Sequence, residues 1–514
     1  MLSQAFSRRL FLKSTAGLAV GSLLPLPSFG VVRKNPQFSA YPFACGVASG
    51  DPAPDGVVLW TRLAPKPLEG GGMPNENVEV SWTIADDETM TKVVQKGTAI
   101  ASPELGHSVH VEAEGLEPNR GYFYQFKAGS ETSPVGRTKT APALDGRLDR
   151  LRFAFASCQH YESGLFTAYE HMAKQPLDVV IHLGDYIYEN GGRDRQIRKH
   201  VGPEIKTLEQ YRNRHAQYKT DKHLQATHQA FPWIVTWDDH EFDNNCAGAI
   251  SEHADVSTED YLERRAAAYQ AYYEHMPLRR TSIPQGPDMQ LYRRIRYGYL
   301  ADFFVLDTRQ YRSDQPCGDG KKKPCPEARD PKRSLLGFEQ EQWLQNGLSK
   351  STSNWNVLAQ QVMLAPVDRD PGEKIAKSMD QWPGYEANRR RLLSFLHEAK
   401  IRNPVVLTGD IHSNWANDLN LPNDGPTVAT EYVGTSIASG GNGGPRKEYA
   451  QGVMADNPFV KFFNGQRGFV QCEITPELWR SDYQVVEQVT QPGASLNRVA
   501  SFVTESGKPG VQKG

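Results

Sequence analysis

The sequence has little excess charge of either sign. Its 514 residues include 58 Lys and Arg against 60 Asp and Glu, a formal net charge of -2 at pH 7. This balance gives no electrostatic reason to expect a nucleic acid or an anionic membrane as a partner. Internal repeats and low-complexity tracts are missing too. The 44 glycines and 34 prolines predict many loops and argue against long helical bundles.

Long apolar runs are absent as well. The most apolar N-terminal stretch, residues 14–24, is shorter than the roughly 20 residues that a membrane-spanning helix needs. It follows the sequence SRRLFLK, and paired arginines before Phe-Leu-Lys are similar to the twin-arginine export signal. We therefore expect residues 1–30 to be a targeting segment for the twin-arginine export machinery, with a generic basic leader as the alternative. This predicts a periplasmic or secreted protein without stable membrane insertion.

Cysteine is scarce, with six in the whole chain. Cys317 and Cys325 flank a polar loop and are a candidate disulfide pair in an oxidising compartment, and two free thiols are the alternative. Spacing alone does not pair Cys45, Cys246 or Cys472. Each of these three is more often a small buried apolar residue than a ligand.

The first third of the chain predicts a β-sandwich. Alternating apolar and polar residues, separated by turn signals, occur at residues 57–62, 78–84, 93–101, 108–114 and 122–128. Tyr122 lies in GLEPNRGYFYQF, which is similar to the tyrosine corner of fibronectin-type-III-like domains. We expect a sandwich domain over residues 40–140 with a supporting role, because no cluster of metal ligands occurs there.

From residue 150 onward, apolar strands alternate with helical patterns, which predicts a layered α/β catalytic domain over residues 150–514. Helices are expected at residues 165–174, 208–229, 258–274, 338–350 and 386–400. The tail from residue 491 is polar and is expected to fray.

Polar side chains follow the first two apolar strands of this region. In open α/β sheets, ligands collect at the carboxyl ends of strands. Asp185 offers two oxygens that can bridge two cations, and Tyr188 can reach the same metal as a phenolate, which suits Fe3+. Cys158, after the preceding strand, offers a soft thiolate ligand. The alternatives are a turn aspartate, a core tyrosine and a buried structural cysteine.

A run of acids ends the strand at residues 233–237. Asp238 and Asp239 repel each other unless a cation or an arginine neutralises them. We expect Asp239 to bind a metal and the next residue, His240, to contact phosphate or donate a proton. A solvated turn is the alternative.

Further candidates follow later strands. Residues two apart in an extended chain project to the same side, so Asp410 and His412 are expected to reach one site on two different cations. Asn414 is an additional candidate near them. Arg309 carries a fork-shaped group that suits phosphate oxygens, and an ion pair with Asp307 or a neighbouring acid is its alternative.

Gln360 and Gln361 interrupt a strand that otherwise looks buried. One of them is a candidate for lending an amide oxygen to the metal region. The alternative is a core amide that satisfies buried backbone groups.

Taken together, these motifs resemble the alkaline phosphatase D (PhoD) branch of the calcineurin-like and purple-acid metallophosphoesterases. The matching pieces span about residues 43–470: FACGVASGDP, GVVLWTRL, SCQ, LGDYIYE, TWDDHEF, LDTRQYR, QWPGY and LTGDIHSNW. The resemblance implies a fibronectin-III-like β-sandwich followed by a four-layer α/β/β/α domain. It also implies hydrolysis of phosphate esters outside the cytoplasm, as an alkaline phosphatase with phosphodiesterase activity that serves phosphate acquisition.

The resemblance further implies an Fe3+ and Ca2+ centre. Its metal ligands are Cys158, Asp185, Tyr188 and His412 at iron, with Asp185, Asp239 and Asp410 at calcium. Two residues depart from the purple acid phosphatases: Cys158 replaces their first Asp, and Asp410 stands where a His binds their second metal. The second site is therefore all oxygen, and this set favours calcium over zinc.

The expected chemistry is attack on a phosphate ester bound at the metals. The catalytic residues in this scheme are His240 and Arg309, and the substrate-binding residues are Asp238, His240, Arg309 and Asn414. Two other classes stay open at this point: a dedicated phosphodiesterase or phospholipase D-type enzyme of the same fold, and a metal-binding scaffold protein without catalysis.

Overall fold

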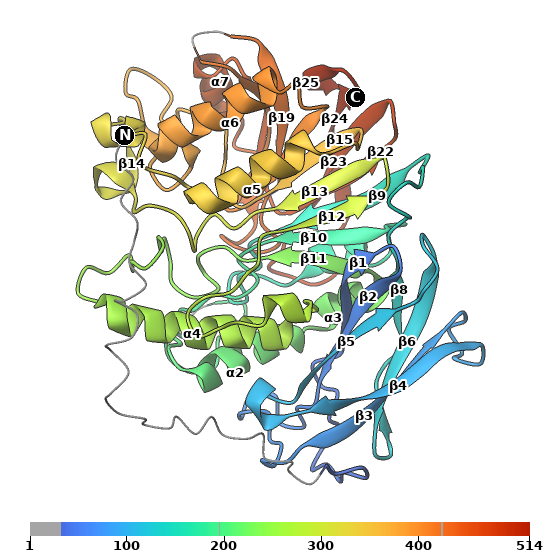
Figure 1. Ribbon diagram of the computed structural model, residues 1–514. Helices are drawn as coiled ribbons and strands as arrows, with labels where there is room; N and C mark the ends of the chain where they lie inside the picture. The colour runs from blue at the N-terminus through green and yellow to red at the C-terminus, as the bar shows by residue number, and fades with distance from the viewer. Residues whose placement is uncertain (1–31, 195, 423–424) are drawn as a thin grey trace, which may run out of the picture.

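The computed structural model describes residues 32–194, 196–422 and 425–514, so the expected targeting segment lies outside the described residues. Two large sheets lie face to face in the middle of the molecule, with helices on the outer side of each (Figure 1). This is the expected four-layer α/β/β/α arrangement.

The larger sheet has ten strands. In spatial order they are β25 (Lys508–Lys513), β24 (Leu496–Glu505), β23 (Leu478–Val486), β22 (Gly468–Ile474), β9 (Leu151–Ala156), β10 (Val179–Leu183), β11 (Pro232–Thr236), β1 (Val47–Ala53), β2 (Gly56–Arg62) and β5 (Ser108–Glu114). The central strands β9, β10 and β11 run parallel, so their carboxyl ends meet at one edge.

The second sheet has eight strands. Their spatial order is β12 (Arg293–Tyr297), β13 (Ala301–Val305), β15 (Trp355–Ala359), β17 (Pro404–Thr408), β19 (Thr427–Val433), β18 (Asn414–Asn420), β21 (Val460–Gln466) and β20 (Gly443–Gly444). Phe153 and Ile181 of the first sheet share a core with Phe303, Val357 and Leu407 of the second. These strands read as continuous apolar runs because both of their faces are buried.

Helices cover the outer faces. On the ten-stranded sheet these are α1 (Thr167–Met172), α2 (Leu208–Lys219), α3 (Lys222–Ala230) and α4 (Thr258–His275). On the eight-stranded sheet they are α5 (Phe338–Ser349), α6 (Glu386–Glu398) and α7 (Lys447–Asp456). The single helix expected at residues 208–229 was wrong: Asp221 accepts hydrogen bonds from the backbone N–H groups of His223 and Leu224 and so begins a second helix.

The expected β-sandwich is present, but one of its sheets continues into the catalytic region. Strands β3 (Val78–Ala85), β4 (Val93–Ala101), β6 (Gly121–Ala128), β7 (Glu131–Thr132) and β8 (Gly136–Lys139) form the other sheet. It packs over β1, β2 and β5 around a shared apolar core. The Tyr122 hydroxyl accepts a hydrogen bond of 2.9 Å from the Glu117 N–H, as a tyrosine corner does. Strand β1 pairs in parallel with β11, with Ser49 opposite Pro232.

The C-terminal tail corrects another expectation. Strands β24 and β25 form a hairpin at the edge of the ten-stranded sheet and do not fray. Phe502 packs into the core between the sheets, and Thr504 hydrogen-bonds Tyr432 of the other sheet at 2.9 Å. Side chains of these strands alternate between the core and the solvent, which is typical of a β-strand. The polar composition of the tail hides this alternation in the sequence.

Two smaller predictions also have outcomes. The disulfide between Cys317 and Cys325 is formed. Within the described ranges, no helix is long and apolar enough to cross a bilayer.

Candidate metal centre

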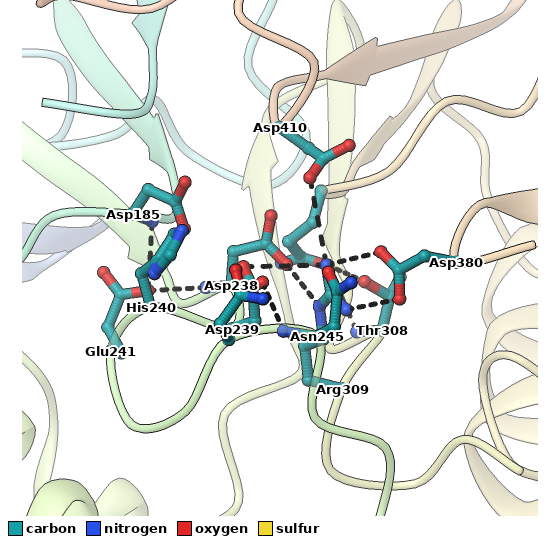
Figure 2. A network of polar contacts seen from close by, with 12 residues as sticks. Asp185, Asp238, Asp239, His240, Glu241, Asn245, Thr308, Arg309, Asp380 and Asp410 are labelled. Carbon is teal, nitrogen blue, oxygen red and sulfur yellow. Dashed lines mark hydrogen bonds and ion pairs between the residues drawn. The ribbon is translucent and has the colours of Figure 1, made fainter. Parts of the chain in front are cut away.

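The candidate ligands lie where strands of the two large sheets end. Cys158 and Asp185 follow β9 and β10. Asp239 follows β11 of the same sheet, and Asp410 follows β17 of the other sheet. Figure 2 shows Asp185, Asp239 and Asp410 entering one region from separate loops. The four-layer fold thus brings distant parts of the chain together at one edge, as the sequence predicts.

The backbone is strained at these strand ends. Cys158, Asp185, Asp410 and His412 have φ values of 59°, 56°, 60° and 53°, a region that L-residues rarely adopt. Each such residue costs on the order of 1–3 kcal/mol, and such strain clusters at functional sites. At Gly184, with φ 107°, an added Cβ would lie 2.5 Å from the Asp238 backbone nitrogen. Only glycine lets the two strand ends approach so closely.

One side of the centre combines four kinds of donor. Donor atoms of Cys158, Asp185 and His412 all lie within 4.8 Å of one another. The Tyr188 hydroxyl donates to Asp185 Oδ2 at 2.8 Å and lies 3.3 Å from His412 Nε2. We call Cys158, Asp185, Tyr188 and His412 the iron side, after the ion that the resemblance predicts for them. They offer a thiol, a carboxylate, a phenol and an imidazole to one ion.

The other side consists of carboxylates. Oxygens of Asp238, Asp239 and Asp410 lie within 4.8 Å of one another, and Asp185 forms a similar group with Asp239 and His240. Asp185 Oδ1, Asp239 Oδ1 and Asp238 Oδ2 are buried and have no hydrogen-bond partner among the described residues. Buried carboxylate oxygens without partners are costly, and bound cations would satisfy them. We call Asp239 and Asp410, with the shared Asp185, the calcium side, after the ion that the resemblance predicts for them.

Burial raises the pKa of three of the candidate ligands: Cys158, Tyr188 and Asp410. Burial and then the Asp185 carboxylate raise the pKa of the Cys158 thiol and of the Tyr188 phenol. Burial and then Asp380 raise the pKa of Asp410 to about 7. A cation reverses each effect because it stabilises the deprotonated ligand, so the donor set fits metal ions.

His240 is a predicted site residue whose pKa is raised by neighbouring carboxylates, so that its ring is positively charged at neutral pH. Burial lowers the pKa of His240, whereas the carboxylates of Glu189, Asp185 and Asp239 raise it. The net result is a pKa well above the usual value for histidine. Nδ1 of His240 lies 2.7 Å from Glu189 Oε2, and the side chain is 16% exposed. Its ring lies 4.1 Å from that of Tyr188, between centroids. The imidazolium is therefore fixed beside the iron side and reachable from solvent.

Arg309 and Asp238 are placed differently from the expectation. Arg309 is fully buried, and its Nε donates to Asp238 at 2.5 Å. NH1 donates to Asp380 at 2.8 Å, and NH2 lies 3.6 Å from Asp239 and 3.9 Å from Asp410. Figure 2 shows the guanidinium surrounded by these acids. The ion-pair alternative for Arg309 is formed, with Asp238 and Asp380 as its partners. The contacts with phosphate expected of Asp238 and Arg309 stay predictions.

Three amide side chains do not join the centre. The Asn414 oxygen accepts from the Thr435 N–H at 3.1 Å, within its own sheet. The Gln361 oxygen accepts from the Thr308 N–H at 3.1 Å, and Gln360 donates to the Thr408 hydroxyl at 2.7 Å. All three amides serve buried polar groups, and the contacts of Gln360 and Gln361 are those of the core-amide alternative. The substrate contact expected of Asn414 stays a prediction.

The structure adds supporting residues that the sequence did not single out. Glu241 accepts from the N–H groups of Asp185 at 3.0 Å and Asp238 at 2.7 Å, which ties two strand ends together. Gln381 donates to Asp410 Oδ2 at 2.6 Å, and the Ser439 hydroxyl lies 2.7 Å from that of Tyr188. Glu241 belongs to the acidic run and was within reach of sequence reasoning. Gln381 begins QWPGY, a motif of the resemblance to which the sequence analysis gave no role, and Ser439 lies in a loop outside the quoted motifs.

Comparison with known proteins gives matches along most of the chain. A family model described as PhoD-like phosphatase matches residues 153–483, and one described as its N-terminal domain matches residues 30–142. The chain is 53% identical to "Alkaline phosphatase D" of Bacillus subtilis (strain 168), over 99% of this chain and 90% of that protein. A solved structure described as "Structure of PhoD" is 54% identical, has a TM-score of 0.90 and covers 93% of each chain.

Proposed function

The chain belongs to the PhoD-like phosphatase family and is a hydrolase of phosphoric esters, and we propose that it works over one Fe3+ and at least one Ca2+ outside the cytoplasm. Enzymes of this type depend on metals. The observation that carries the proposal is the place of Asp185, which belongs to donor groups on both sides of the centre. When bound, such ions neutralise charge on a phosphate and generate a nucleophile from water.

Iron is assigned to the side with Cys158, Asp185, Tyr188 and His412. A thiolate and an imidazole suit iron, and a phenolate selects its hard trivalent form. Ser439 supports this assignment because its hydroxyl lies 2.7 Å from the Tyr188 oxygen and fixes the phenol in place. The Tyr188 phenol is therefore already oriented toward the position proposed for iron.

Calcium is assigned to the carboxylate side. Asp185, Asp239 and Asp410 supply only oxygen, which calcium prefers. Gln381 fixes Asp410 through its hydrogen bond of 2.6 Å, and the Asn245 N–H fixes Asp239 Oδ2 at 2.8 Å. The arginine behind these acids, Arg309, offsets part of their mutual repulsion and is assigned a positioning role.

His240 is the proposed catalytic residue among the non-ligands. Its Nδ1 is occupied by Glu189, so the opposite ring nitrogen is the one that can face an ester. A protonated ring there donates a hydrogen bond to a phosphate oxygen and gives a proton to the leaving alkoxide. Glu189 acts through His240: it keeps the proton on Nδ1 and stabilises the positive charge of the ring.

The location and the substrates are part of the proposal. Export by the twin-arginine machinery to the periplasm or beyond is supported by the N-terminal motif SRRLFLK, and a disulfide of the kind found at Cys317–Cys325 is typical of oxidising compartments. We propose small phosphate monoesters, with some diesters, as substrates for phosphate acquisition. The domain boundaries near residues 140–150 stay a prediction.

The proposal is tested by replacing the shared ligand. Asp185→Ala is expected to lose both metals and nearly all hydrolysis of aryl phosphates, while the folded sheet signal in circular dichroism is kept. Asp145→Ala, at an exposed acid that precedes the amino end of β9, is the control and is expected to keep both metals. A variant at Asp185 that retains iron, calcium and activity would contradict the proposed function.

A further inference from the structure

A disulfide-closed loop lies beside the calcium side. The bond between Cys317 and Cys325 closes it, and Lys322 Nζ donates to the carbonyl oxygens of Cys317 at 2.9 Å and Gly318 at 2.7 Å. A short strand in the loop, β14 (Lys321–Lys322), pairs with β16 (Lys377–Ser378). The loop is therefore held to itself and to the segment that leads into Asp380.

Asp319, inside this loop, has a backbone conformation that glycine adopts more easily than aspartate does. Its φ and ψ are 56° and -174°, between Gly318 with φ 70° and Gly320 with φ 75°. This region of the φ/ψ map is occupied almost only by glycine. A strained aspartate between two glycines indicates that its carboxylate does something a third glycine would not.

The Asp319 carboxylate reaches the candidate centre through one intermediate residue. Oδ2 of Asp319 accepts a hydrogen bond of 3.0 Å from Asn245 Nδ2. The Asn245 N–H in turn donates to Asp239 Oδ2 at 2.8 Å, a contact visible in Figure 2. Asn245 has a φ of 46°, so its own backbone also needs support.

The residues just before the loop hold Asn245 from a second direction. Gln315, two residues before Cys317, donates from Nε2 to the Asn245 carbonyl oxygen at 2.5 Å. The same Nε2 donates to Asp380 Oδ1 at 2.8 Å. The side chain of Asn245 is thus bound by the disulfide-closed loop, and its carbonyl oxygen is bound by the segment that leads into this loop.

We infer that the disulfide-closed loop is a positioning device for the calcium side, acting through Asp319 and Asn245 on the Asp239 carboxylate. This inference rests on the proposed role of Asp239 as a calcium ligand. Asp319 orients Asn245, and the Asn245 N–H holds one oxygen of Asp239. The other oxygen lies 3.6 Å from Arg309 NH2 and has no hydrogen-bond partner among the described residues, so it stays open to an ion. The strained backbone at Asp319 then serves to position the carboxylate for calcium binding, and it does not stabilise the fold.

Asp319→Gly gives the sharpest test because it removes the carboxylate and relieves the backbone. We expect a melting temperature of the calcium-free protein equal to or above that of the parent, with calcium affinity weakened about 10-fold or more by titration calorimetry. Asp319→Asn keeps an oxygen that can accept from Asn245 and is expected to retain most of the affinity. Asp255→Gly, at an exposed acid elsewhere, is the control for lost charge and is expected to change neither measurement.

The disulfide is tested separately. Cys317→Ser with Cys325→Ser removes the closure without touching Asp319. We expect weaker calcium affinity and a raised calcium requirement for hydrolysis, while the iron content stays unchanged. Loss of melting temperature alone, with calcium affinity kept in both the Asp319→Gly and the double-serine variants, would overturn the inference.

Asp239→Asn separates failure of this inference from failure of the proposed function. If Asp239→Asn leaves calcium affinity unchanged, the assignment of Asp239 to calcium is wrong and the inference is overturned with it. If Asp239→Asn weakens binding but Asp319→Gly does not, only the positioning role is overturned. If Asp319→Asn is as damaging as Asp319→Gly, the charge of Asp319 matters and the hydrogen-bond account is contradicted.

Discussion

The two sides of the centre use the same structural device for different chemistry. Cys158 and Asp410 each follow a buried parallel strand and each have a positive φ. The iron side gathers four donor types, and Arg467 contacts it at the carbonyl oxygen of His412. On the calcium side, Asp239 and Asp410 lie near the Arg309 guanidinium, which also pairs with Asp238 and Asp380. The same backbone arrangement can therefore present two different sets of donors at one edge of the paired sheets. The two sets differ only in the residues that follow the strands.

The largest effect is expected where the two sides meet. Asp185→Ala removes a ligand from both ions, and we expect kcat/KM to fall at least about 10^4-fold, or roughly 5–6 kcal/mol of barrier lowering. Steady-state kinetics with an aryl phosphate and elemental analysis on the same sample check this. A loss of only one metal would break the comparison, because Asp185 would then belong to one side.

Variants on a single side sharpen the comparison. Cys158→Ala is expected to lose iron and retain calcium, and Asp410→Asn is expected to lose calcium and retain iron. Each is expected to reduce kcat/KM about 10^2- to 10^3-fold, less than the shared ligand, because one ion still binds the substrate. Elemental analysis distinguishes them. Loss of both metals in either variant would show that the sides are not separable.

A smaller effect is expected beside the iron side. Glu189→Gln removes the carboxylate that raises the pKa of His240, so the ring loses its proton at a lower pH. We expect the alkaline limb of the pH–rate profile to move to lower pH, with about a 10-fold loss of kcat at alkaline pH. His240→Ala is the reference and is expected to lose that limb altogether. An unchanged profile in Glu189→Gln would remove Glu189 from the account.

The smallest effect on catalysis is expected from lowering the pH. Low pH reduces the stability of the fold and does not act through the residues of the iron side or the calcium side. Burial lowers the pKa of His182 to about 3 and that of His110 to about 4. The unfolded chain binds more protons than the folded one below the ordinary histidine pKa of about 6.5, so stability falls as pH drops below that value. At pH 5 each histidine is expected to cost on the order of 2 kcal/mol. Urea unfolding at pH 7.5 and pH 5 measures this, and His182→Gln is expected to reduce the difference.

Sequence reasoning picked out candidate ligands that the fold brings close together, because each of them follows an apolar strand. Asp185 and Asp410 are identified by a local change from buried strand to polar residues, and such a change needs no knowledge of the rest of the fold. The pairing of β1 with β11 joins residues about 180 positions apart and has no local signal. The buried ion pairs of Arg309 were also out of reach, because they depend on which acids the tertiary fold brings near it.

Elemental analysis of the purified protein together with its visible absorption spectrum tests the central claim most directly. The account predicts iron and calcium in one sample, with a tyrosinate-to-iron band that disappears in Tyr188→Phe while calcium is kept. Active protein that contains no iron, or an iron band that survives in Tyr188→Phe, would contradict it.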